Sequence, residues 1–156
     1  MTAYFDTSAL VAVYVTEAHS NAARRALRAQ GPIPFTPLHH LELRNACELL
    51  VGRSLLSPLE LDALTIHIQD DRQAGRLIDT AIDWEATFTR AGDLSRVYTR
   101  KHLTRSLDLL HVALAVEIGC RVFVSGDHRQ LKVARNLKLR SIDIARRRPK
   151  RSNAGA

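Results

Sequence analysis

Four acidic residues lie where an apolar segment of the chain meets another element, and their side chains are the ones most able to do chemistry. They are Asp6, Glu42, Asp108 and Asp127. Asp6 and Asp127 each follow an apolar run, whereas Asp108 opens the most apolar helical segment. In an open α/β sheet, residues at the carboxyl ends of the strands converge on one crevice. Converging carboxylates repel one another unless a cation compensates their charge, so the four residues predict a cation site.

The type of these side chains indicates which cation to expect. An all-oxygen acidic site suits magnesium or manganese rather than zinc. His39, His40 and His111 have no further nitrogen or sulfur ligands at zinc spacing, and they are interpreted as scaffold or surface residues. The pattern therefore points to metal-assisted phosphate chemistry.

Each acid alone also has a simpler interpretation. Asp6 and Asp127 can be helix caps with no further role, because aspartate oxygens accept hydrogen bonds from first-turn N–H groups. Glu42 can be an ordinary surface residue beside an apolar helix stripe. Asp108 lies among three leucines, where an unpaired carboxylate is costly. The joint arrangement of the four, more than any single residue, favours a functional site.

Strand-like and helix-like segments alternate along the chain, which is typical of an α/β fold with right-handed crossovers and a parallel sheet covered on both faces. Capping signals mark several helix starts, such as Ser57 with Glu60, Asp83, and Asp127 with Gln130. The expected strands are 2–6, 33–36, 76–82, 120–125 and 139–144, and the expected helices are 8–15, 21–29, 37–51, 57–73, one after Asp83, 106–118 and 127–137.

Two helix faces are predicted in more detail. The helix over 37–51 is expected to bury one apolar stripe next to Glu42. The adjacent pair Asp70 and Asp71 is expected on a solvated face and not as a joint site, because neighbouring helical residues point in different directions. The stripe consists of Leu38, Leu41, Ala46, Leu49 and Leu50.

Composition bounds the protein class. A length of 156 residues and 46% hydrophobic content favour one globular domain. No apolar run approaches the roughly 18 residues of a membrane span, and no signal peptide is recognised, so a cytoplasmic location is expected. Cys47 and Cys120 show no metal or redox spacing and are expected to be small buried residues in a reducing compartment.

The net charge of +7 is concentrated at the C-terminus. Residues 146–156 contain five cations and no acid, which leaves a charge of +2 for residues 1–145. We therefore expect a domain over 1–145 followed by a basic tail over 146–156. The tail either contacts phosphates electrostatically or is a solvated terminus.

Four segments of the chain resemble, in order and spacing, the motifs of PIN-domain ribonucleases, and most of all the VapC-type toxins of toxin–antitoxin pairs. The resemblance covers roughly residues 2–144. Its segments are Tyr4-Phe5-Asp6-Thr7-Ser8-Ala9-Leu10, Leu41-Glu42-Leu43-Arg44-Asn45-Ala46, Ser106-Leu107-Asp108-Leu109-Leu110-His111-Val112-Ala113-Leu114-Ala115 and Val124-Ser125-Gly126-Asp127.

The resemblance implies a single PIN-like domain with a five-stranded parallel sheet of order 3-2-1-4-5 flanked by helices. It also implies a Mg²⁺- or Mn²⁺-dependent ribonuclease that cuts structured RNA such as tRNA or rRNA, works as a homodimer and is silenced by a cognate antitoxin protein. The catalytic residues it implies are the four acids, with Asp6, Asp108 and Asp127 holding the metal and Glu42 assisting by position or through water. Ser8, Ser125 and Arg105 are the supporting residues, with Arg105 a candidate for phosphate contact.

Two other functional classes remain open at this point. One is an acid-site phosphatase or phosphoacceptor domain, although a haloacid-dehalogenase phosphatase would have a second aspartate two residues after Asp6, where this chain has Ser8. The other is a non-catalytic binding module whose acidic groove accepts a basic segment of a partner.

Overall fold

The computed structural model describes residues 2–146 of the chain. Of the predicted tail, only Arg146 belongs to this range, and its side chain is exposed. The other tail residues, 147–156, lie outside the described residues. Within the described range, no helix is both long enough and apolar enough to cross a membrane.

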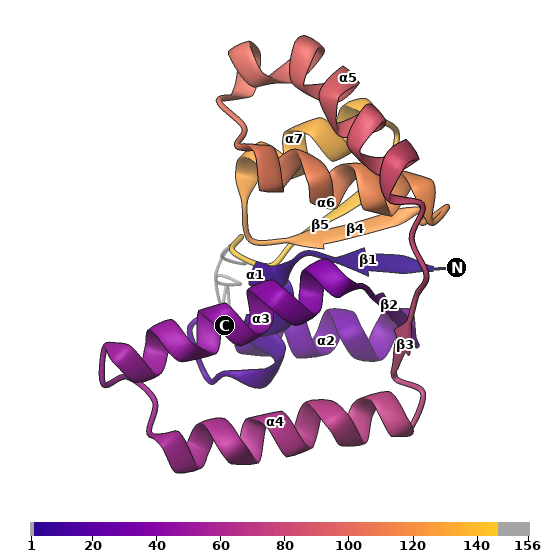
Figure 1. The fold of residues 1–156 in the computed structure, drawn as a ribbon. Helices are drawn as coiled ribbons and strands as arrows, with labels where there is room; N and C mark the ends of the chain where they lie inside the picture. The colour runs from indigo at the N-terminus through magenta and orange to yellow at the C-terminus, as the bar shows by residue number, and fades with distance from the viewer. Residues whose placement is uncertain (1, 147–156) are drawn as a thin grey trace, which may run out of the picture.

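Helices and parallel strands alternate as the sequence predicts (Figure 1), and each predicted element is present within a few residues of its expected bounds. The elements are β1 (Ala3–Phe5), α1 (Thr7–Tyr14), α2 (Ser20–Gln30), β2 (Ile33–Phe35), α3 (Pro37–Gly52), α4 (Pro58–Gln73), β3 (Leu77–Asp79), α5 (Trp84–His102), α6 (Ser106–Glu117), β4 (Val122–Ser125), α7 (His128–Asn136) and β5 (Arg140–Asp143).

The expected single sheet of five strands is wrong. Backbone hydrogen bonds join β1, β4 and β5 into one three-stranded parallel sheet, with β4 in the centre. They join β2 and β3 into a separate two-stranded parallel pair. Strands β1 and β2 lie next to each other, but no strand ladder connects them in the described residues.

Pro34 and His39 account for the break between β1 and β2. The backbone groups of Ile33 and Phe35 are used by the chain around β3, because Ile33 N–H donates to the carbonyl of Arg76 and the Phe35 carbonyl accepts from Thr80. This leaves Pro34 to face β1, and proline has no N–H to donate to a ladder. The Phe5 carbonyl accepts instead from the side chain of His39, whose Nε2 lies 2.8 Å away.

Two hydrogen bonds with the backbone fix the tautomer of His39. Its Nδ1 accepts from the backbone N–H of Thr36 at 3.0 Å, so Nε2 carries the proton that it donates to Phe5. Burial away from water lowers the pKa of this imidazole to about 3, and His39 therefore stays neutral near pH 7. The prediction of a scaffold role for His39 agrees with these contacts.

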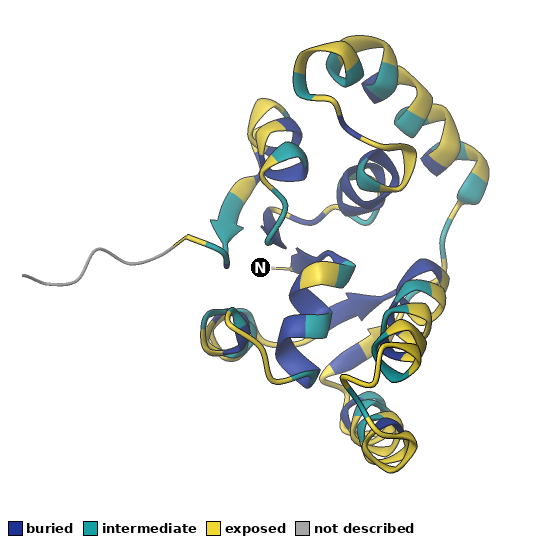
Figure 2. Ribbon diagram, turned by 90° about the vertical axis from the view of Figure 1, so that its left-hand side faces the viewer, coloured by how far each residue is buried: buried dark blue, intermediate teal, exposed yellow. Residues whose placement is uncertain are grey.

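The sheet separates two apolar cores, which Figure 2 shows as buried ribbon on either side of the strands. Side chains alternate between the two faces, as strand geometry requires. Ala3 and Phe5 pack with α1, α2 and α3, whereas Tyr4 packs with α6 and α7. Strands β1 and β4 are thus buried on both faces. Because the two strands are parallel, their carboxyl ends lie at the same edge of the sheet.

The buried face of α3 differs from the predicted stripe. Leu41 and Leu49 are 68% and 49% exposed, because the helix is rotated so that His39 rather than Leu41 faces the core. Glu42 lies at the border between the buried and exposed faces. The buried residues of the helix are Leu38, His39, Leu43 and Cys47.

Both cysteines are free and buried, as expected. Burial raises the pKa of the Cys120 thiol to about 11 and also raises the pKa of the Cys47 thiol. A raised thiol pKa disfavours the thiolate, so both residues are suited to packing rather than to reaction.

Asp71 is buried, and its predicted place on a solvated face is wrong. Its carboxylate accepts from the hydroxyl of Tyr14 at 2.7 Å and from Nε of Arg76 at 2.7 Å. The tyrosine belongs to α1 and the aspartate to the last turn of α4. The contact therefore ties α4 to the helix that follows the first strand.

Replacing Asp71 by alanine should lower the free energy of unfolding by about 1–3 kcal/mol, because the buried Tyr14 hydroxyl loses its partner. The half-exposed guanidinium of Arg76 remains solvated, which keeps the loss below that of a fully buried ion pair. Urea denaturation measures the change. The neighbouring Asp70→Ala is the matched control, since Asp70 is exposed and its loss should change stability by less than about 0.5 kcal/mol. Equal effects of the two substitutions would contradict the assignment.

Candidate active site

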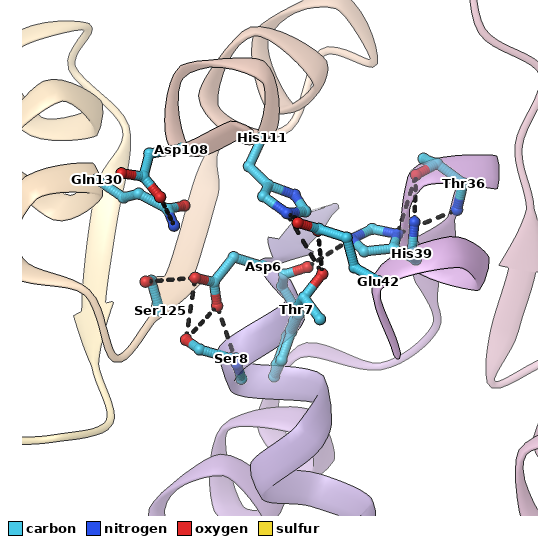
Figure 3. Close-up of polar contacts among 12 residues, drawn as sticks. Asp6, Thr7, Ser8, Thr36, His39, Glu42, Asp108, His111, Ser125 and Gln130 are labelled. Carbon is cyan, nitrogen blue, oxygen red and sulfur yellow. Dashed lines mark hydrogen bonds and ion pairs between the residues drawn. The ribbon is translucent and has the colours of Figure 1, made fainter. Parts of the chain in front are cut away.

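Asp6 lies at the carboxyl end of β1 and is fully buried. Its carboxylate accepts from the backbone N–H of Ala9 at 2.9 Å, so it caps α1 as the simpler sequence interpretation requires. It also accepts from the hydroxyl of Ser8 at 2.8 Å and from the hydroxyl of Ser125 at 2.7 Å (Figure 3). Capping thus explains only one of the contacts of this carboxylate.

The same two serines connect Asp6 to the end of β4. The hydroxyl of Ser125 accepts from the backbone N–H of Asp127 at 2.8 Å, and the hydroxyl of Ser8 accepts from the N–H of Gly126 at 3.0 Å. A hydroxyl can donate and accept at once. Ser8 and Ser125 therefore hold the carboxyl ends of two neighbouring strands at a fixed separation, with Asp6 between them.

Asp127 is the N-cap of α7 and is half-buried. Its Oδ1 accepts from the backbone N–H groups of Arg129 and Gln130 at 2.7 and 3.4 Å. Its Oδ2 lies 3.2 Å from the guanidinium of Arg129. Burial raises the pKa of this carboxyl, but the hydrogen bonds and charge of Arg129 outweigh burial and leave the pKa below its usual range. Asp127 is therefore ionised near neutral pH.

The sequence suggested that Asp108 is buried among leucines, but it is half-exposed in the first turn of α6. The neighbouring Leu109 and Leu110 belong to the buried face of this helix, whereas Asp108 points toward α7 (Figure 3). Its carboxylate accepts from the backbone N–H of Arg105 at 2.9 Å and from the side-chain amide of Gln130 at 3.3 Å. The side chain of Arg105 itself is exposed at the start of the helix.

Gln130 links two of the acids. Its backbone N–H reaches Asp127 and its amide nitrogen reaches Asp108, so one residue of α7 connects the ends of α6 and β4. The amide oxygen of Gln130 is buried and has no hydrogen-bond partner among the described residues. An unpaired buried oxygen is costly, which marks this position as one that suits an additional donor or a cation.

Glu42 approaches from α3 on the other side of Asp6 (Figure 3). Its carboxylate accepts from the hydroxyl of Thr7 at 2.6 Å and is paired with Nε2 of the buried His111. The Nδ1 of this histidine lies 2.8 Å from the hydroxyl of Tyr4. Burial raises the pKa of Glu42, but His111 and Thr7 more than offset it and leave the pKa below its ordinary value. An ordinary surface glutamate has none of these contacts.

The residues fit a hard divalent cation in kind, because every candidate ligand is a carboxylate or amide oxygen. Burial raises the pKa of Asp6 even though His111, Ser125 and Ala9 oppose the shift, so its charged form lacks sufficient compensation within the protein. Among residues 2–146, however, no three Asp, Glu, His or Cys side chains lie close enough together to form a ready metal site. Arg129 and Gln130 engage the carboxylates of Asp127 and Asp108 in this arrangement.

Four residues at the site were not assigned to it by the sequence, and one of them, Thr7, follows Asp6 within the first motif but was given no role. Gln130 was recognised only through its capping distance from Asp127, and His111 was interpreted as scaffold although it stands one turn after Asp108 on the same helix. Arg129 follows Asp127 by two residues and carried no motif. Gln130 and His111 each lie three residues after an acid of the site, and that spacing was the available signal for these two residues.

Comparison with known families gives one match. The family model described as PIN domain matches residues 3–136 of this chain, a range that contains all four acids and all but the last strand. No protein in the curated comparison set matches the chain.

Proposed function

The chain belongs to the PIN-domain family, and from this membership and its acidic site we propose that it is a metal-dependent ribonuclease. PIN domains are in general metal-dependent nucleases. The observation that carries the proposal is the fully buried Asp6, joined through Ser125 to Asp127 at the carboxyl ends of β1 and β4. A buried carboxylate beside a second carboxylate is costly without a cation.

In this proposal Asp6, Asp108 and Asp127 hold Mg²⁺ or Mn²⁺ directly or through water. The chemistry that such a cation supplies is polarisation of a phosphate oxygen and activation of a water for attack on phosphorus. Ser8 and Ser125 orient Asp6. Thr7 and His111 hold Glu42 in its ionised form next to the site, where it can orient the attacking water.

The finer identity is also part of the proposal. We propose a toxin of a toxin–antitoxin pair that acts in the cytoplasm on a structured RNA of the tRNA or rRNA class and is silenced by a basic segment of its antitoxin. The pairing of Arg129 with Asp127 supports the last point, because a basic side chain of a partner would make the same type of contact with this carboxylate. A nuclease domain over 1–145 and a basic tail over 146–156 complete the proposed organisation.

We also propose that the chain forms a homodimer, which an exposed apolar surface on α5 and α6 supports. Phe88 and Leu107 are 60% and 48% exposed, and both line a cavity of about 380 Å³ between the two helices. Leu103, in the connection between them, is also exposed. A second copy of the chain that covered these side chains would remove apolar area from water.

One observation favours a second candidate, a binding module without catalytic activity. Without a ready set of three metal-binding side chains in the described residues, and with an arginine already on Asp127, the acids can serve a basic partner segment alone. Nothing comparable favours a phosphatase.

A single experiment separates these classes. The purified full chain is incubated with labelled tRNA, with single-stranded DNA and with p-nitrophenyl phosphate, each in Mn²⁺ and in EDTA. We expect RNA cleavage in Mn²⁺ and none in EDTA. Phosphate release without RNA cleavage would instead indicate a phosphatase, and no turnover under any condition would favour the binding module.

A further inference from the structure

The exposed face of α7 carries mainly basic side chains, of which only His128 and Arg129 lie beside an acid in the described residues, namely Asp143 and Asp127. Every position of this helix that is not buried is basic or an amide, namely His128, Arg129, Lys132, Arg135 and Asn136. Lys138 and Arg140 continue the exposed series into β5, and no acid occurs from residue 128 to residue 142. We call Arg129, Lys132, Arg135, Lys138 and Arg140 the α7 stripe.

Arginines on three other helices are paired differently. Arg44 on α3 is paired with Glu48, Arg72 on α4 with Asp79, and Arg90 on α5 with Glu117. In the α7 stripe, Arg129 is paired with Asp127, but no ion pair of the described residues involves the other four members. Among the described residues, other unpaired arginines occur, such as Arg25 and Arg28 on α2, but the stripe gathers four unpaired cations along one helix and its connection to β5.

The stripe has a direction set by the fold. Helix α7 begins where β4 ends, beside Asp127, and it finishes where β5 begins, at the opposite edge of the parallel sheet. From Arg129 to Arg135 a helix rises about 9 Å. The stripe thus starts at the acidic site and leads away from it over one outer surface of the molecule.

We infer that the α7 stripe binds the phosphate backbone of single-stranded RNA and guides it into the acidic site. This inference rests on the proposed function, since it assumes that the acids act on a phosphodiester. A chain of phosphates is the polyanion that must reach Asp127, and uncompensated Lys and Arg side chains bind phosphates without reading sequence. Four acidic residues alone would repel that chain, and a neighbouring row of cations offsets this repulsion.

The test is equilibrium binding of a fluorescently labelled single-stranded RNA of mixed sequence to the full chain. EDTA is present throughout, so that metal-dependent cleavage does not interfere. The variant is Lys132→Gln with Arg135→Gln. The matched control is Arg25→Gln with Arg28→Gln, which removes two exposed arginines from α2, a helix that packs against the other face of the sheet. All proteins keep the tail, so its contribution is the same in each.

Loss of two contacts should weaken binding roughly tenfold near 0.1 M salt and reduce the slope of log affinity against log salt by about 1.4. The α2 control should retain the parent affinity and slope. Equal losses in the two variants, or none in either, would overturn the inference, as would competition by polyglutamate as strong as competition by unlabelled RNA. If the stripe variant binds RNA as tightly as the parent while the parent cleaves RNA in Mn²⁺, the inference about the α7 stripe is wrong but the proposed ribonuclease activity stands.

Discussion

Asp6→Asn and Asp127→Asn should each reduce metal-dependent RNA cleavage by at least about a hundredfold. Removing one carboxylate ligand forfeits several kcal/mol of charge stabilisation, and each 1.36 kcal/mol corresponds to tenfold in rate. The fold should survive, because asparagine caps a helix as well as aspartate does. At Asp6, the two neighbouring serine hydroxyls can turn to accept from the new amide.

The structure offers a matched control for these substitutions. Asp83 caps α5 through the backbone N–H of Ala86 at 3.0 Å, as Asp6 caps α1, but it lies outside the acidic site. Asp83→Asn should leave cleavage unchanged. Rates are measured on labelled RNA in Mn²⁺, with melting curves to verify folding. A folded Asp6→Asn protein that cleaves at the parent rate would remove Asp6 from the catalytic assignment.

Local features of the fold could be predicted from the sequence because their causes lie within a few residues. Ser57 and Glu60 form the expected capping box, with the N–H of Ser57 donating to Glu60 at 2.8 Å. Asp83 and Asp127 cap the helices that follow them, as predicted. The parallel α/β architecture followed from the alternation of such elements.

Contacts between distant segments could not be predicted in this way. The pairing of Glu42 with His111 joins residues 69 positions apart. It depends on the rotation of α3 about its axis, and the predicted apolar stripe gave the wrong rotation because it included Leu41, which is exposed. The break between β1 and β2 depends on which side of β2 faces its neighbour at Pro34. An acid motif therefore identified the edge of the sheet where the site lies, while the geometry of the site required tertiary structure.

The half-exposure of Asp108 has the same origin. Its leucine neighbours in sequence suggested burial, yet a helix directs successive side chains about 100° apart, so one residue can face outward beside buried ones. Asp108 points toward Gln130 on α7. The three predicted metal-binding residues thus come from β1, α6 and the start of α7, and their roles remain predictions.

Binding of a divalent cation should stabilise the folded protein. At about 100 Kd of Mn²⁺, mass action adds about 2.7 kcal/mol to the free energy of unfolding. For a domain of this size that corresponds to a rise of roughly 5–10 °C in the melting temperature. Asp108→Asn should reduce the rise, because it removes one ligand, whereas Asp83→Asn should retain it. An unchanged melting temperature in saturating Mn²⁺ would speak against a metal site.

Asp6 adds a pH dependence whose sign is fixed by its pKa. Burial raises the pKa of Asp6 in the folded state, so the stability linked to this group is present below its unfolded pKa and is lost as the pH rises through the folded value. In EDTA at neutral pH, Asp6→Asn should therefore melt at a higher temperature than the parent, and the difference should shrink toward pH 4. In Mn²⁺ the order should reverse, because only the parent keeps the ligand. A variant less stable than the parent in EDTA at neutral pH would show that Asp6 is compensated within the protein and does not require a cation.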